Sequence, residues 1–180
     1  MTRKWTFQEL QAQHSALNAS AGRPRRPISV ILDDIRSLHN VGAIFRTADG
    51  ACLEHLYLCG ITGTPPRDEI RKTSLGAEEV VPWSYHQNPE EPVASLRQQG
   101  YQIVALEQTT TSVDYRSAAY RFPLCLIVGH EYNGVQDSLV ALADMAIDIP
   151  MKGVKLSLNV SVAFGISVYE LCAKWEDIRT

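Results

Sequence analysis

Short apolar segments recur along the 180 residues of this chain, and a stretch of helical periodicity follows most of them. The clearest segments, at residues 28–32, 55–61, 101–106, 124–129 and 145–149, are continuously apolar rather than alternating. Continuous apolar strands are buried on both faces, as in a parallel sheet that helices cover on each side. The sequence therefore predicts an α/β fold with a parallel sheet and helices on both of its faces.

Helices and two further elements are expected between these strands. The spacing of apolar residues predicts helices at 4–20, from 41 to about 52, at 68–75, 90–99 and 134–142, and from 160 onward. Residues 79–82 are expected to form another short strand, and residues 107–112 a polar loop. Gly100 should follow the end of the helix at 90–99, because glycine readily adopts the left-handed conformation found there.

The segment that joins the last strand to the last helix carries several polar signals. Pro150 cannot donate a hydrogen bond to a sheet, so the strand should end there. Gly153 is expected to permit a sharp turn, and Ser157 to act as the N-cap of the helix. Asn159 is expected in the first turn. Polar side chains should thus surround a helix N-terminus, whose free N–H groups can bind acceptors.

The composition is that of an ordinary globular protein, with 45% apolar residues, 21% charged residues and a net charge of -3. We expect an N-terminal helical and basic extension at residues 1–27 and one domain at 28–180. The four cysteines form no Cys-x-x-Cys pair, which favours a cytoplasmic protein with reduced thiols. No apolar run approaches membrane-spanning length and the polar N-terminus is unlike a signal peptide, so no membrane partner is expected.

Several well-known ligand-binding and catalytic motifs are missing from the sequence. It has neither a Gly-x-Gly-x-x-Gly after the first strand nor a P-loop, which argues against dinucleotide and P-loop triphosphate binding. It also lacks the Gly-x-Ser-x-Gly of esterases. The five histidines never pair at metal-ligand spacing, so no metal site is expected.

Polar residues are instead concentrated where the strands of the predicted sheet end. Ligands of open parallel sheets bind beyond the carboxyl ends of the strands, here the loops at 33–40, 107–112, 129–134 and 150–157. These loops and the helices after them carry five candidate residues: Asn40, Arg46, Glu131, Ser157 and Asn159. Taken singly, Asn40 is better explained as a helix cap, and Arg46 as a surface charge on an amphipathic helix. The conjunction of all five indicates a site.

Three segments, in order, resemble the signature motifs of the SpoU/TrmH branch of SPOUT RNA methyltransferases. They are Asn40-Val-Gly-Ala-Ile-Phe-Arg46, Val128-Gly-His-Glu-Tyr-Asn-Gly134 and residues 149–163. The resemblance spans roughly residues 28–172, and it identifies the domain at 28–180 as a SPOUT methyltransferase domain. It implies 2′-O-methylation of a ribose in structured RNA, with S-adenosyl-L-methionine as the methyl donor. It also implies a deep C-terminal trefoil knot and an obligate homodimer.

The resemblance further assigns roles to individual residues. The cofactor is expected to bind at Leu106, Glu107, Gln108, Gly129, Ile149, Met151 and Leu158. Arg46 is implied to act on the reacting 2′-hydroxyl, and Asn40, Glu131, Ser157 and Asn159 to support the catalytic site. A guanidinium is normally protonated, so Arg46 would need help to act as a general base. Two mechanisms stay open: Arg46 accepts the proton transiently, or it orients the hydroxyl and stabilises the developing alkoxide electrostatically.

Contact with RNA should depend on local basic patches, because the net charge is near zero. The candidates are Arg23, Arg25, Arg26, Lys152 and Lys155, although residues 21–27 are equally consistent with a solvated linker. The substrate is either tRNA or rRNA, and the small size of the chain slightly favours tRNA. Two other interpretations stay open: a non-catalytic RNA-binding module that retains the knotted fold, and an α/β domain with a different nucleotide ligand.

Overall fold

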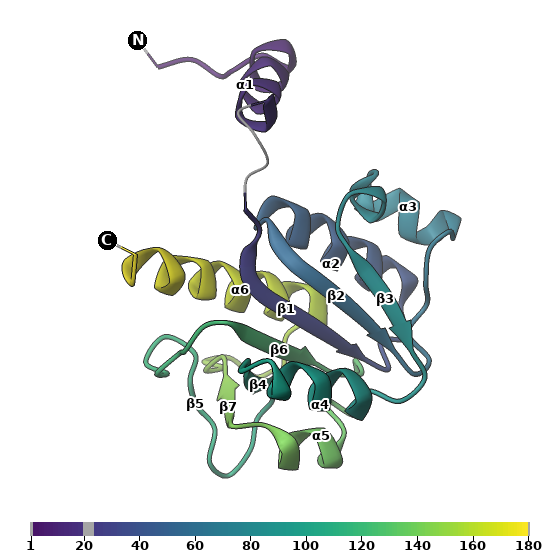
Figure 1. Cartoon of the computed structure of the whole chain (residues 1–180), viewed down its shortest axis with the longest axis vertical. Coiled ribbons are helices and arrows are strands. Elements are labelled where there is room, and N and C mark those ends of the chain that lie inside the picture. The colour runs from purple at the N-terminus through teal and green to yellow at the C-terminus, as the bar shows by residue number, and fades with distance from the viewer. Residues whose placement is uncertain (1, 20–23, 180) are drawn as a thin grey trace.

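The computed structural model describes residues 2–19 and 24–179 of the chain. Its strands form one sheet in the order β3-β2-β1-β6-β4-β7-β5 (Figure 1). They are β1 (Arg26–Asp33), β2 (Leu53–Cys59), β3 (Trp83–His86), β4 (Gln102–Leu106), β5 (Val113–Asp114), β6 (Leu124–Val128) and β7 (Met145–Asp148). Every strand pair in this sheet is parallel, which confirms the predicted α/β fold.

Helices cover both faces of the sheet, as predicted. On one side lie α2 (Leu38–Gly50), α3 (Asp68–Ser74) and α6 (Val160–Asp177), and on the other α4 (Glu90–Gln98) and α5 (Asp137–Leu142) (Figure 1). A short 3-10 helix, η1 (Ala77–Glu79), follows α3. The first helix, α1 (Phe7–Ala19), falls within the predicted 4–20 and lies apart from the sheet.

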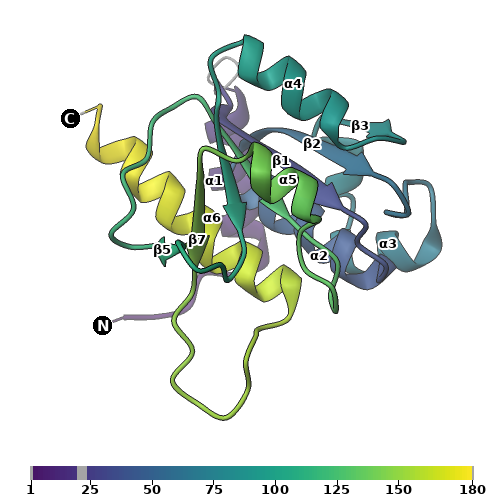
Figure 2. The ribbon, with the colours of Figure 1, turned by 90° about the horizontal axis from the view of Figure 1, so that it is seen from below.

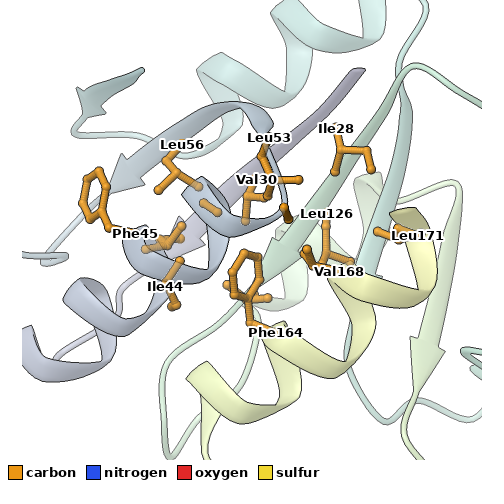
Figure 3. Packing of buried hydrophobic residues seen from close by; sticks show 14 of the residues in the cluster. Ile28, Val30, Ile44, Phe45, Leu53, Leu56, Leu126, Phe164, Val168 and Leu171 are labelled. Carbon is orange, nitrogen blue, oxygen red and sulfur yellow. The ribbon is translucent and has the colours of Figure 1, made fainter. Parts of the chain in front are cut away.

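The larger hydrophobic core lies between the sheet and helices α2 and α6 (Figure 3). Phe45 of α2 and Phe164 of α6 are fully buried in it beside strand residues such as Leu126. Burying a side chain of this size stabilises the folded state by about 1.5–3 kcal/mol. The apolar faces predicted from the sequence are therefore the ones that hold both helices on the sheet.

One local prediction is wrong, and one strand was not predicted. Residues 79–82 form no strand; the edge strand β3 begins at Trp83, after Pro82, which has no N–H to donate to the ladder. The two-residue strand β5, which pairs with β7, is too short to leave a periodic signal in the sequence. Gly153 lies at a bend, as predicted, but without a left-handed backbone, and a Cβ there would meet nothing within 4 Å among the described residues.

The carboxyl ends of all these parallel strands point to one edge of the sheet, where the loops after β1, β4, β6 and β7 begin. The segment 149–159, between β7 and α6, is a long excursion from the body of the protein (Figure 2). Among the helices of residues 2–19 and 24–179, none is long and apolar enough to span a membrane.

Candidate active site

A pocket of about 220 Å³ opens where β4, β6 and β7 end and α6 begins. All seven residues predicted to hold the cofactor line it: Leu106, Glu107, Gln108, Gly129, Ile149, Met151 and Leu158. Two residues predicted to be catalytic, Glu131 and Ser157, line it as well. Three loops that are far apart in the sequence thus contribute to a single cavity.

One wall of the pocket is the tight turn at 129–134, after β6. His130 N–H donates to the Gly134 carbonyl (3.0 Å), and Gly134 N–H donates back to the His130 carbonyl (2.9 Å). This closure brings Gly129 so near that a Cβ on it would lie 2.2 Å from the carbonyl carbon of Gly134 and from the nitrogen of Val135. The glycine is therefore required by the chain's own backbone.

Side chains of the 107–108 loop brace the other walls of the pocket. Glu107 accepts hydrogen bonds from Val135 N–H at Oε2 (2.9 Å) and from Gln108 N–H at Oε1 (2.8 Å). Gln108 donates through Nε2 to the Leu156 carbonyl (2.6 Å) in the segment 149–159. The loop after β4 is thereby tied to both of the other loops, and Glu107 has a structural role as well as a place in the lining.

A hydrogen-bonded chain connects Glu131, Asn40 and Asn159. Asn40 Nδ2 donates to Glu131 Oε1 (2.8 Å), and Asn159 Nδ2 donates to Asn40 Oδ1 (3.1 Å). Glu131 also accepts from the backbone N–H groups of Arg36 (3.0 Å) and Ser37 (2.9 Å). Three of the five predicted catalytic residues therefore form one network, which joins the N-terminal ends of α2 and α6.

The carboxylate of Glu131 is held in its ionised form. Partial burial raises the pKa of Glu131, but hydrogen bonds from Asn40, Ser37 and Arg36 outweigh that effect, and the net pKa is lowered. A negative charge beside the N-terminus of α2 is further favoured by the helix dipole. Glu131 can therefore act as a fixed acceptor that orients the amide of Asn40.

The helix caps differ from those expected. Asn159, rather than Ser157, is the N-cap of α6: its Oδ1 accepts from the N–H (2.9 Å) and Oγ (2.7 Å) of Ser161. The helix begins at Val160, so Ser157 lies too far upstream to cap it. Ser37 caps α2 by accepting from Asn40 N–H (3.3 Å), which leaves the Asn40 side chain free for the network.

Arg46 lies apart from the other predicted catalytic residues. It is exposed on α2 and is not among the pocket-lining residues. At about 100° per residue, it lies about 120° around the helix axis from Asn40. Among the described residues its guanidinium has no hydrogen-bond or ion-pair partner. The catalytic role of Arg46 therefore stays a prediction.

The predicted RNA-binding residues fall into two groups. Arg25 donates to the carbonyls of Leu53 (3.0 Å) and Val80 (2.6 Å), and Arg26 to the Ala51 carbonyl (2.6 Å) and to Glu176 (2.5 Å). Both arginines lie where β1 begins, at the sheet edge opposite the pocket, and these contacts occupy donors that RNA would need.

Lys152 and Lys155 are instead exposed on the segment 149–159, whose Met151 and Ser157 line the pocket. Arg23 lies outside the described residues. The geometry thus favours the two lysines over the arginines as RNA contacts, and all of these assignments stay predictions.

Several pocket residues were missed by the sequence reasoning: Val128, Tyr132, Asn133, Gly134, Val160 and Ala163. Most are neighbours of Glu131 or Asn159, so proximity to these two in the sequence was the available signal.

The sequence reasoning also missed Asp33, which lies outside the pocket lining and supports the turn at 129–134. Its fully buried carboxylate accepts from Gln136 N–H (2.9 Å) and Nε2 (2.5 Å) and anchors the chain beyond the turn. Burial raises the pKa of Asp33.

Comparison with known proteins gives a consistent result. The model of the SpoU rRNA Methylase family matches residues 27–169. The chain is 36% identical over 146 residues to a tRNA (guanosine(18)-2′-O)-methyltransferase of Aquifex aeolicus, covering 81% of this chain and 69% of the relative. It is 35% identical over 147 residues to the Escherichia coli protein of the same name, covering 81% of this chain but only 63% of that relative.

Solved structures agree in fold. The A. aeolicus TrmH/SpoU tRNA modifying enzyme matches with a TM-score of 0.81 at 32% identity, covering 94% of this chain and 85% of that one. An AdoMet-bound rRNA methyltransferase from Sinorhizobium meliloti matches with a TM-score of 0.77 at 32% identity, covering 85% and 59%. The similarity therefore extends over the sheet, the pocket and most of the helices.

Proposed function

This chain belongs to the SpoU rRNA methylase family, and we propose that it transfers the methyl group of S-adenosylmethionine to a ribose 2′-hydroxyl of tRNA. The observation that carries the proposal is the single pocket lined by every residue expected to hold the cofactor. The names of the A. aeolicus and E. coli relatives support tRNA over rRNA as the substrate.

The pocket walls suit this methyl donor chemically. Apolar side chains of Leu106, Ile149 and Leu158 can enclose an adenine ring, and the backbone of the 129–134 turn can read its edge. The lining also includes two carboxylates, Glu107 and Glu131, and no lysine or arginine among the described residues. A negative lining favours a sulfonium cation over an anionic ligand.

When bound, S-adenosylmethionine supplies an electrophilic methyl group, and the chain's residues must position the acceptor. Glu131, which lines the pocket, fixes Asn40, and Asn40 fixes Asn159, whose neighbours Leu158 and Val160 line the pocket as well. In-line transfer requires close alignment of the reacting atoms, so this rigid positioning would supply much of the acceleration. Arg46 would act on the 2′-hydroxyl, either by accepting its proton transiently or by stabilising the developing alkoxide.

The assembly proposed for this activity is a homodimer with a deep trefoil knot. The support for the dimer is an exposed apolar stripe on α6: Val162, Ile166 and Tyr169 recur at helical spacing and are 50%, 37% and 57% exposed. The support for the knot is the resemblance of residues 149–163 to the third signature motif of the family. We further propose residues 1–27 as an extension of a domain at 28–180. The free cysteines support a cytoplasmic location.

Two measurements test the function. Labelled S-adenosylmethionine should transfer methyl to tRNA and leave a ribose resistant to alkaline cleavage, and S-adenosylhomocysteine should raise the melting temperature. The position of Arg46 outside the pocket is the one observation that favours the alternative, a non-catalytic RNA-binding module. RNA binding with no methyl transfer to either tRNA or rRNA would support that alternative and refute the proposed activity.

A further inference from the structure

Tyr132 presents an unusual surface beside the pocket. Its side chain is 92% exposed, although the residue belongs to the pocket lining and directly follows Glu131. A ring that formed part of the cofactor's enclosure would be expected to contact the pocket walls and be largely covered. Tyr132 instead offers both of its faces to whatever approaches the mouth of the pocket from solvent.

The backbone that carries this ring is held firmly. His130 Nδ1 accepts hydrogen bonds from the N–H groups of Tyr132 (3.0 Å) and Asn133 (3.2 Å), inside the turn closed by His130 and Gly134. The preceding residue, Glu131, is fixed on the N-terminus of α2 by three hydrogen bonds. The backbone position of Tyr132 is therefore preorganised, and a ligand that stacks on the ring need not order the loop first.

The surroundings favour a nucleobase as the partner of this ring. The Glu131–Asn40–Asn159 network, where the ribose is proposed to react, begins at the adjacent residue. Lys152 and Lys155, on the segment that forms another side of the pocket, can contact phosphates. RNA is recognised mainly through unpaired bases that stack on aromatic side chains, and one such stack is worth roughly 5- to 140-fold in affinity.

We propose that Tyr132 is a substrate-binding residue that stacks on an unpaired base next to the methylated ribose. The inference rests on the proposed function and deepens it, because it predicts that the target nucleotide lies in a loop or is drawn out of its stack. It also separates two tasks in one turn: Glu131 organises the reacting groups, and Tyr132 holds the RNA.

The test uses the full-length chain, unmodified tRNA transcripts and three variants at one position. Tyr132→Ala should raise the KM for tRNA about tenfold, equivalent to about 1.4 kcal/mol, while kcat stays within about twofold of wild type. Tyr132→Phe keeps the stacking face and should retain the wild-type KM. Tyr132→Leu keeps apolar area without an aromatic face and should behave like Tyr132→Ala. Calorimetry should show the same Kd for S-adenosylmethionine in all four proteins.

Each other outcome has a definite meaning. An unchanged KM in Tyr132→Ala overturns the inference, as does a Tyr132→Phe variant that fails equally, because the hydroxyl would then carry the effect. A tenfold weaker Kd for S-adenosylmethionine in Tyr132→Ala assigns the ring to the cofactor. A changed oligomeric state by light scattering assigns it to a second copy of the chain. If the wild-type chain methylates no RNA at all, the proposed function fails, and the Kd for tRNA in a filter-binding assay decides this inference. Equal Kd values for wild type and Tyr132→Ala overturn it, and an about tenfold weaker Kd in Tyr132→Ala supports base stacking without methyl transfer.

Discussion

Replacing Gly129 by alanine should damage the pocket without adding or removing any polar group. The new Cβ would lie 2.2 Å from Gly134 C and Val135 N, whereas ordinary contact begins near 3.4 Å. The turn must therefore move by about 1.2 Å, the difference between these two distances. That movement also stretches the 2.9 Å hydrogen bond from Val135 N–H to Glu107.

The expected cost follows from these displacements. Overpacking of this kind typically costs about 1–3 kcal/mol, which for a domain of this size lowers the melting temperature by roughly 2–12 °C. A misplacement of about 1 Å in a catalytic site can cost about a hundredfold in rate. We therefore expect Gly129→Ala to remain folded, to bind S-adenosylhomocysteine at least tenfold more weakly, and to lose about a hundredfold in kcat/KM.

The chain offers a matched control for this experiment. Gly153 lies on the segment 149–159, has an ordinary backbone conformation, and a Cβ there would meet nothing within 4 Å among the described residues. Gly153→Ala should leave both the melting temperature and the Kd from calorimetry unchanged. If Gly129→Ala matches wild type in both measurements, the turn is not packed as the structure shows, and the reasoning is wrong.

Three further predictions follow from other side chains. Arg46→Ala should abolish methyl transfer, while the melting temperature and the Kd for the cofactor stay at wild-type values. Arg46→Lys should fail equally, because an ammonium lacks the planar fork of the guanidinium. Turnover near wild type in either variant would refute the catalytic role of Arg46. Because the pKa of Glu131 is lowered in the folded state, its stabilising contribution is present above about pH 4.3 and lost as the pH falls through the folded pKa. Melting curves of Glu131→Gln should therefore depend less on pH below this value than those of wild type, and parallel curves would contradict the assignment. Ser167 Oγ is buried in α6 without a hydrogen-bond partner among the described residues. Ser167→Ala should therefore raise the free energy of unfolding, measured by urea titration, by about 1 kcal/mol. A lower free energy of unfolding would show that the hydroxyl has a hydrogen-bond partner after all.

The sheet could be predicted from the sequence because it depends on local signals, whereas the residues of the pocket were predicted from the family resemblance. Continuous apolar runs mark buried parallel strands wherever they occur, and Leu126, in the most apolar run, lies fully buried in the core. The residues expected to hold the cofactor were assigned by the family resemblance, and they lie where strands end: Leu106 is the last residue of β4, and Gly129 and Ile149 directly follow β6 and β7.

Features decided by contacts between distant segments could not be predicted in the same way. The N-cap of α6 is set by the residue at which the helix begins, and the segment before it has no periodicity from which that residue could be predicted. The helix begins at Val160, so Asn159 and not Ser157 is the N-cap. The structural role of Glu107 depends on Val135 arriving beside it from another loop. Arg46 fits the motif in sequence, yet helical geometry turns it away from Asn40 in the single chain.

The connection between the catalytic network and the helix ends has a consequence for any mutational study of this site. Glu131 binds the N-terminus of α2, Asn159 caps α6, and Asn40 joins the two. Substituting any of these three removes an N-cap or a partly buried hydrogen bond, so losses of rate and of stability will occur together. Arg46 and Tyr132 are exposed, and their side chains form no hydrogen bond with the described residues. A loss of activity at constant melting temperature at these two positions is therefore the cleaner evidence of a direct role in RNA methylation.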